Sequence, residues 1–241
     1  MVHLVIGIVA VLTGTLSAVA GLGGGVVLLG VLAQFFPPVT AIPIQGGIQL
    51  VSNGSRATML RGDINWKVVA QTSLLIIPAS FLGVAVATSI PEDATRLLLG
   101  VFLLIITWRP GWLRWTGDRQ LGAGSMVGVG AASGFLNSTV GASGPFTSPF
   151  LKAVTASHIA FVATAATSQI VAHVAKLWAF TADGFQYRDH LALMAVGAIG
   201  TFIGTRIGGR FLNRSDDDRL QIVFNAVLTI LALRLIIRAL L

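Results

Sequence analysis

Apolar sequence runs almost without interruption through this chain, and this continuity limits what the chain can fold into. The predominantly apolar stretches are 3–36, 41–60, 68–90, 95–108, 121–154, 158–181, 190–212 and 220–238. Only 10% of the 241 residues are charged, whereas about 25% is usual in soluble proteins. So few charges cannot cover a surface that faces water. The sequence therefore predicts a multi-pass membrane protein and excludes an ordinary cytosolic enzyme.

The basic residues are scattered, which bears on the partners of the chain. There are 16 Lys and Arg residues against 9 Asp and Glu, a net charge of +7, and most of the bases stand singly at the ends of apolar stretches. Such placement is typical of residues that orient membrane helices, and not of a nucleic-acid-binding surface. The chain has no cysteine, which excludes disulfides and thiolate metal sites. Membrane lipid is an expected partner, and nucleic acid is not.

Two of the apolar stretches are too long to be single membrane helices. Stretches 3–36 and 121–154 would each measure roughly 51 Å as one helix, against a hydrocarbon core of about 30 Å. Each is interrupted near its middle, at Gly21–Gly25 and at Gly141–Pro145. Non-helical backbone at membrane depth is tolerated only where protein or a water-filled cavity surrounds it. We therefore predict a broken helix or a re-entrant hairpin at both places.

The two halves of the chain resemble each other at a fixed offset of 120 residues. The offset aligns Gly14 with Gly134, Gly24 with Gly144, Gln49 with Gln169, Asn53 with His173, and Arg56 with Lys176. This predicts an all-α polytopic fold of two homologous repeats, each with about four hydrophobic segments. The first repeat would be 1–108 and the second 121–241, with a cytoplasmic linker at 109–120.

The relative orientation of the repeats depends on the two long stretches. If each stretch crosses the membrane once, the chain has eight crossings and parallel repeats; if each dips in and returns, it has six and inverted repeats. The loop bases divide 8 to 3 between the two sides in the inverted arrangement and 7 to 4 in the parallel one. The enrichment of bases on the cytoplasmic side favours inversion.

The breaks are the first candidate for a binding site. Each exposes the N–H groups at the start of the following helix, and a helix N-terminus suits an anion. Glycine lets a ligand approach the backbone closely, and Ser143 adds a hydroxyl donor. The residues assigned to this site are Gly21, Gly23, Gly24, Gly25, Gly141, Ser143 and Gly144. The alternative is close helix packing through small residues, which requires no ligand.

A polar stripe follows each break and completes the candidate site. In the first half Gln45, Gln49, Ser52, Asn53 and Arg56 share one helical face, and in the second half Gln169, His173 and Lys176 do. Both stripes should face the interior, because polar groups cost too much in lipid. From them we assign Gln49, Asn53, Arg56, Gln169, His173 and Lys176 to anion binding. Alternatively, the two cations snorkel to the interface, and the glutamines join helices through hydrogen bonds.

Other kinds of chemistry lack support in the sequence. The acidic residues all lie in loops or at the ends of apolar stretches, which argues against a cation site. His173 could relay a proton, although a neutral hydrogen-bond donor is the preferred interpretation. Serine, histidine and aspartate occur at no spacing that indicates a nucleophilic triad. No enzymatic activity, cofactor or metal is therefore expected.

The two breaks and their surroundings resemble the sulfite exporter TauE/SafE family. The resemblance rests on Gly14 to Gly25, on Gly134 to Pro145, and on Phe150, Thr164, His173 and Lys176. It implies a multi-pass transporter in a prokaryotic plasma membrane that moves sulfur-containing anions such as sulfite, organosulfonates or thiosulfate. Ser143 and Pro145 replace two glycines in the second break, so the two half-sites need not contact the anion equally.

We therefore expect alternating-access transport of a small sulfur-containing anion. Export or facilitated movement is favoured, because outward movement of a negative charge needs no coupling ion in an inside-negative cell. Two alternatives stay open: a transporter of another small anion such as a carboxylate, and a membrane-embedded partner or assembly subunit without transport. The oligomeric state is also open, and a homo-oligomer is compatible with the sequence.

Overall fold

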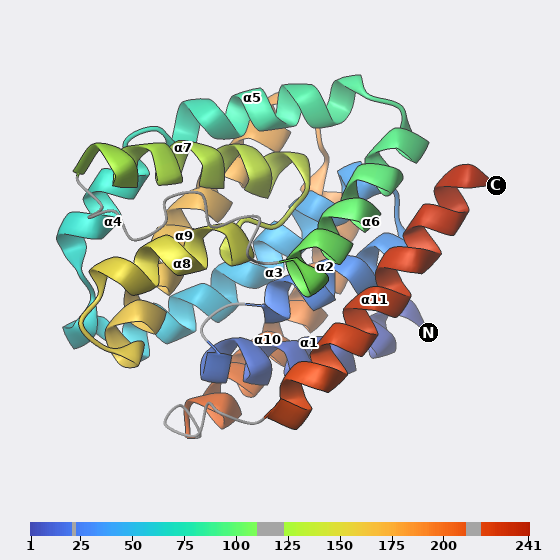
Figure 1. The fold of residues 1–241 in the computed structure, drawn as a ribbon. Coiled ribbons are helices and arrows are strands. Elements are labelled where there is room, and N and C mark those ends of the chain that lie inside the picture. Colours follow the sequence, from blue (N-terminus) through green and yellow to red (C-terminus); the bar gives the residue numbers. More distant parts are fainter. Residues whose placement is uncertain (21–22, 110–122, 211–217) are drawn as a thin grey trace.

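A computed structural model describes residues 1–20, 23–109, 123–210 and 218–241 of the chain. The described residues form a bundle of helices without strands (Figure 1), which confirms the all-α prediction. In chain order the helices are α1 (Val2–Ala20), α2 (Gly24–Phe35), α3 (Pro38–Met59), η1 (Arg61–Asp63), α4 (Trp66–Ser73), α5 (Ile76–Ser89), α6 (Glu92–Trp108), α7 (Ala123–Thr139), α8 (Gly144–Val154), α9 (His158–Ala182), η3 (Tyr187–His190), α10 (Leu191–Gly209) and α11 (Asp218–Leu240). Apart from Arg109, the predicted linker 109–120 lies outside the described residues.

Local sequence signals set where several helices begin. Pro38 and Pro145 stand in the first turns of α3 and α8, where proline costs no helical hydrogen bond. Asn65 and Ser157 cap α4 and α9 with side-chain oxygens that accept backbone N–H bonds at 3.2 and 3.1 Å. These caps hold the connections that lead into the membrane helices.

Three helical stretches of the described chain are long and apolar enough to cross a membrane: Val2–Val19, His158–Ala182 and Tyr187–Gly209. The pair α4 and α5 makes a fourth candidate if its 45° bend lies within one span. These are fewer crossings than the predicted six or eight. One reason is length, because α6 has only 17 residues, and another is composition, because α3 carries a polar stripe. The protein is a multi-pass membrane protein, while its repeats and their orientation stay predictions.

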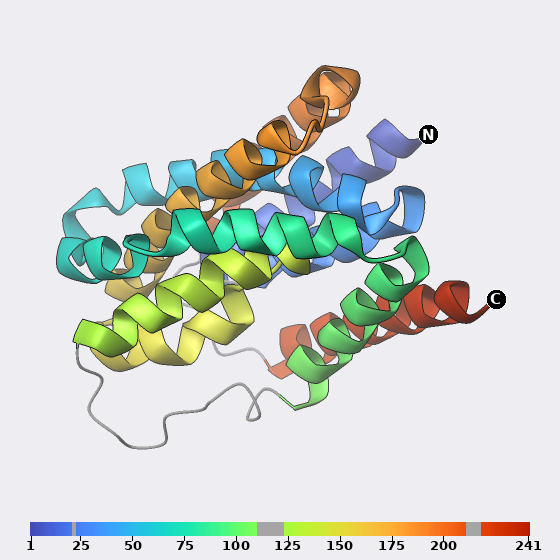
Figure 2. The ribbon, with the colours of Figure 1, turned by 90° about the horizontal axis from the view of Figure 1, so that it is seen from above.

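Helices from opposite halves of the chain pack together. Helix α1 lies along α10, α7 lies along α4 and α5, and α6 pairs with α11 at one edge of the bundle (Figure 2). Glycines permit two of these contacts: a Cβ at Gly204 would collide with the carbonyl oxygen of Val11, and one at Gly130 with that of Thr72. Small residues at helix contacts let backbones approach closely in membrane proteins.

Helices α3 and α9 pass each other in the centre of the bundle. Lys176 near the end of α9 donates to Gln45 near the start of α3, with 2.9 Å between Nζ and Oε1. At the other end, Asn65 beyond α3 donates its backbone N–H to Thr164 Oγ1 near the start of α9 at 2.9 Å. The two helices therefore run antiparallel, and their polar stripes come from opposite directions.

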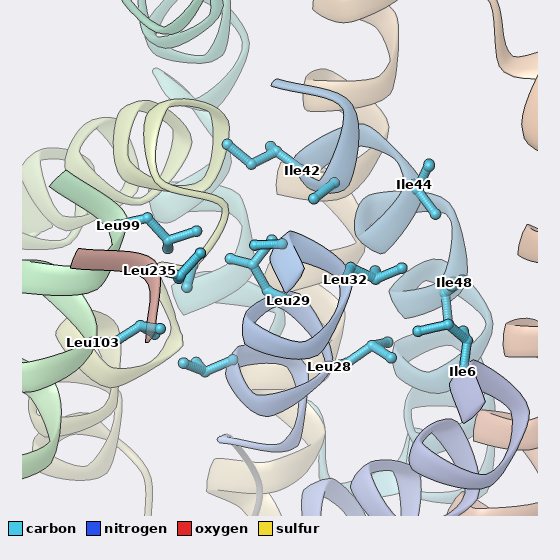
Figure 3. Packing of buried hydrophobic residues seen from close by; sticks show 14 of the residues in the cluster. Ile6, Leu28, Leu29, Leu32, Ile42, Ile44, Ile48, Leu99, Leu103 and Leu235 are labelled. Carbon is cyan, nitrogen blue, oxygen red and sulfur yellow. The ribbon is translucent and has the colours of Figure 1, made fainter. Parts of the chain in front are cut away.

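The short helix α2 lies in the apolar core. Its Leu28, Leu29 and Leu32 are fully buried. Around them lie Ile42, Ile44 and Ile48 of α3, Leu99 and Leu103 of α6, and Leu235 of α11 (Figure 3). At 12 residues, α2 is roughly 18 Å long and does not span a bilayer. Its packing fixes the break that precedes it.

Both predicted breaks are present, and the chain reverses at each. Helix α1 ends at Ala20, and Gly24 at the start of α2 already lies against Thr13 of α1. Helix α7 ends at Thr139, and Ser143 before α8 accepts a hydrogen bond from Ser133 of α7, with 2.9 Å between the hydroxyl oxygens. In each half, the helix after the break packs beside the helix before it.

Candidate functional site

A polar cavity of about 40 Å³ lies between the two breaks. Its lining residues are Ser17, Gly23, Gly25, Val26, Gln45, Gln49, Asn53, Arg56, Asn137, Gly141, Ala142, Ser143, Gly144, Gln169 and His173. Both halves of the chain contribute to the wall. A volume of this order holds a few water molecules or a small solute.

The two breaks aim helix N-termini at this cavity. Gly23 and Gly141 have φ values of 115° and 74°, a backbone region that other residues rarely adopt. Helix α2 starts directly after Gly23 and α8 directly after Ser143. Gly25 and Gly144, in the first turns of these helices, line the cavity. First-turn N–H groups have no partner within their helix, and with the helix dipole they favour a negative charge.

The polar stripe of α3 faces inward, as predicted. Gln45, Gln49, Asn53 and Arg56 are all buried, and all line the cavity. The Arg56 guanidinium donates to the Ser17 carbonyl oxygen at 3.0 Å and to Asn53 Oδ1. These bonds hold its charge at the wall. Because the Arg56 side chain is only 4% exposed, it does not snorkel to an interface.

The stripe of α9 also faces inward, but its members take different positions. Gln169 and His173 line the cavity, whereas Lys176 does not. Lys176 has no exposed surface, and its ammonium donates to Gln45 Oε1 at 2.9 Å and to Asn137 Oδ1 at 3.0 Å. Lys176 therefore holds two residues of the wall from behind, and it does not snorkel either.

Gln169 joins helices and lines the cavity, so the two interpretations of this residue are compatible. Its Oε1 accepts from Asn137 Nδ2 at 3.3 Å, and its Nε2 donates to Ser143 Oγ at 3.1 Å. The amide thereby connects α9 to α7 and to the second break. Gln49, its counterpart in the first half, lies against Gly25 of α2.

His173 brings an uncommitted polar atom to the cavity. Its side chain is buried, and within the described part of the chain Nδ1 has no hydrogen-bond partner. A buried polar atom without a partner is costly, so a solute or water in the cavity would satisfy it.

The electrostatic character of the site is positive. Arg56 and Lys176 are buried, whereas the acids whose side chains the structure describes are exposed: Asp63, Glu92, Asp93, Asp183 and Asp189. Lys176 is held by two neutral amide oxygens. No group of three or more His, Asp or Glu residues that could bind a metal occurs in the described chain. The donors converging here match an anion.

The structure places most of the predicted site residues together. Those on the cavity wall are Gly23, Gly25, Gln49, Asn53, Arg56, Gly141, Ser143, Gly144, Gln169 and His173. Gly24 packs against α1 behind the wall, and Lys176 lies behind Gln45 and Asn137. Gly21 lies outside the described residues.

The sequence-based site lacks five of the lining residues, of which Val26 and Ala142 are apolar and the other three are polar. Gln45 belongs to the α3 stripe but was not assigned to binding, and Ser17 and Asn137 are single polar residues in apolar helices. A signal for the last two was available: Ser17 and Asn137 align at the same offset of 120 residues that relates the breaks.

Membrane-spanning helices around a cationic cavity at two helix breaks define the class of membrane transporters, in which discontinuous helices form solute sites. The chain belongs to the sulfite exporter TauE/SafE family, whose model matches residues 6–235. This family comprises integral membrane transporters of sulfur anions such as sulfite. No curated protein and no solved structure matched the chain.

Proposed function

We propose that the cavity binds a small sulfur-containing oxyanion, of the sulfite, organosulfonate or thiosulfate type, and that the protein carries it across the membrane. One observation carries the proposal. Lys176 is fully buried beside a cavity that two helix N-termini face, and its ammonium donates to the neutral amide oxygens of Gln45 and Asn137. Burying a charge is costly unless an opposite charge or strong hydrogen bonds compensate it, and a bound anion supplies that compensation.

The cavity walls suit an oxyanion with several acceptor oxygens. Amide groups of Gln49, Asn53 and Gln169 and the Arg56 guanidinium come from two helices, so donors can reach different oxygens of one ligand. Val26 and Ala142 supply apolar side chains, and most of the other side chains in the wall are polar. This composition favours a compact, highly charged solute over a larger apolar one.

We further propose that the halves are inverted repeats that rock against each other in alternating access. Several features support this. Helices α2 and α8 begin at Gly24 and Gly144, and α3 and α9 begin at Pro38 and His158, which in both cases is the offset of 120 residues. Helices α3 and α9 are antiparallel, as an inverted relation requires. The contact of α1 with α10 has its counterpart in that of α7 with α5.

Export is the favoured direction. Moving one negative charge outward in an inside-negative cell releases roughly 2.3 kcal/mol per 100 mV, so the membrane potential alone drives it. Uptake would need a coupling ion, and His173 is the residue of the cavity wall that could carry a proton.

The test is flux of labelled sulfite from proteoliposomes under an imposed membrane potential. We expect sulfite flux that follows the potential and falls at least tenfold in the double variant Gln49→Ala, Gln169→Ala. The matched control is Gln186→Ala, which makes the same change on an exposed loop. Absence of anion flux in the wild type, or equal flux in the double variant and the control, would overturn the proposal.

A binding measurement separates transport from a purely structural role. Sulfite, thiosulfate and a small carboxylate are each added to the detergent-purified protein, and its thermal unfolding is followed. A binding site raises the unfolding temperature with ligand concentration. Stabilisation by the carboxylate alone would reassign the substrate class, and no stabilisation by any anion would favour a membrane-embedded assembly subunit.

A further inference from the structure

Lys176 is the most deeply buried charge of the described chain, yet it does not touch the cavity. Its side chain has no exposed surface and is absent from the cavity wall. Its ammonium bridges Gln45 of α3 and Asn137 of α7. Since both of these residues line the cavity, Lys176 acts on the wall through them.

The bridge fixes the orientation of both amides. An ammonium group can only donate, so the amide oxygens of Gln45 and Asn137 must face it. Their NH2 groups are thereby turned away from Lys176. Gln45 Nε2 donates to the Gly25 carbonyl oxygen at 3.2 Å, and Asn137 Nδ2 donates to Gln169 Oε1 at 3.3 Å.

The orientation of Asn137 in turn fixes which atom of Gln169 donates to Ser143 in the second break. With its oxygen occupied by Asn137, Gln169 turns Nε2 toward Ser143 and donates to Oγ at 3.1 Å. Ser133 donates to the same oxygen at 2.9 Å. Ser143 Oγ thus accepts two hydrogen bonds. The acceptor available to its own hydrogen within the network, Gln169 Oε1, is 3.5 Å away, which is too long for more than a weak hydrogen bond.

We propose that Lys176 is a positioning residue. It sets the direction of donation along the series of hydrogen bonds that runs from Lys176 through Asn137 and Gln169 to Ser143, so that the Ser143 hydroxyl donates its hydrogen to an anion in the cavity. The proposal rests on the proposed anion site and deepens it. Hydrogen bonds in a chain polarise one another, and a charged first donor strengthens the effect. Lys176 therefore turns a cavity wall of amides and hydroxyls, which could equally accept, into one that donates.

The test is a double-mutant cycle on sulfite affinity. Calorimetry on the detergent-purified full chain gives the Kd of sulfite for the wild type, Lys176→Met, Ser143→Ala and the double variant. We expect each single change to weaken binding by roughly tenfold or more, the size of one hydrogen bond to a charged group. In the Lys176→Met background, Ser143→Ala should cost less than about threefold, because the hydroxyl no longer has a fixed direction. Two effects that multiply would overturn the positioning role and leave Lys176 as a distant charge.

Two further variants serve as a control and as a substitute in this double-mutant cycle. Lys152→Met removes an exposed lysine outside the cavity and should leave the Kd of sulfite unchanged within about twofold. Asn137→Leu interrupts the series of hydrogen bonds between Lys176 and Gln169 while keeping the Lys176 charge. This variant replaces Lys176→Met in the cycle if Lys176→Met does not fold. A tenfold cost of Ser143→Ala in the Asn137→Leu background would also overturn the proposal.

The outcomes also separate this proposal from the proposed function. Failure of the wild type to bind sulfite, thiosulfate or an organosulfonate would overturn the anion site and the positioning role together. Sulfite binding with independent effects of Lys176 and Ser143 would overturn the positioning role alone.

Discussion

Replacing Gly46 by alanine should displace the Lys176 ammonium without removing its charge. A Cβ at Gly46 would lie 2.6 Å from Lys176 Cε and 3.2 Å from Nζ. Real Cβ atoms do not approach other heavy atoms this closely, so the flexible lysine must move away from Gln45 and Asn137. Gly54, in the same helix, is a matched control, because no atom lies within 4 Å of a Cβ there.

Two opposing contributions decide the sign of the effect on stability. Alanine inside a helix is favoured over glycine by about 1 kcal/mol. A hydrogen bond from a charged group contributes about 1.5–3 kcal/mol, and Lys176 makes two. Loss of even one bond therefore outweighs the helix gain. We expect Gly46→Ala to lower the free energy of unfolding by about 1 kcal/mol or more, whereas Gly54→Ala should raise it by up to about 1 kcal/mol.

The assay is reversible unfolding in mixed detergent micelles, titrated with a denaturing detergent and followed by circular dichroism. Sulfite affinity is measured on the same samples and should fall in Gly46→Ala only. Equal changes in stability and affinity for the two alanine variants would refute the reasoning, because they would show that the position of the Lys176 ammonium does not matter.

Two more results are expected from the packing and from the cavity wall. Gly204→Ala places a Cβ against the backbone carbonyl of Val11 and should lower the free energy of unfolding by about 1–3 kcal/mol in the same assay. Gly54→Ala, with no atom within 4 Å of its Cβ, should not lower it. Equal stabilities of the two variants would contradict the close approach of α1 and α10. His173→Asn, which installs the residue type found 120 positions earlier at Asn53, should keep sulfite flux within about tenfold of the wild type. His173→Leu should lose more flux, since it leaves no hydrogen-bonding group. The reverse order would contradict a hydrogen-bonding role.

The helical fold and its two breaks follow from the sequence for clear physical reasons. Glycine runs within stretches too long for one crossing left few other solutions, and α2 and α8 begin within the predicted breaks. The number of spans was harder to foresee. A polar stripe lowers the hydropathy of α3, and α6 is short, so length and composition alone do not show how each helix meets the membrane.

The candidate site was accessible from sequence where polar residues formed a pattern. Gln49 and Gln169 stand in stripes that had to face inward, and they do line the cavity. Asn137 is a single amide in an apolar helix, and only the repeat offset indicates it. The place of Lys176 behind the wall depends on the antiparallel packing of α3 and α9. Packing of that kind is decided by tertiary contacts and leaves no local sequence signal.

The central claim is that an oxyanion sits between the two breaks, and locating one there is its most direct test. An experimental structure determined with selenite, a heavier analogue of sulfite, would show the anion through the anomalous scattering of selenium. We expect one selenium position in the cavity, with its oxygens within hydrogen-bonding distance of Gln49, Gln169 and Ser143. Selenium bound only outside the cavity, with water alone between Gly23 and Gly141, would contradict the account.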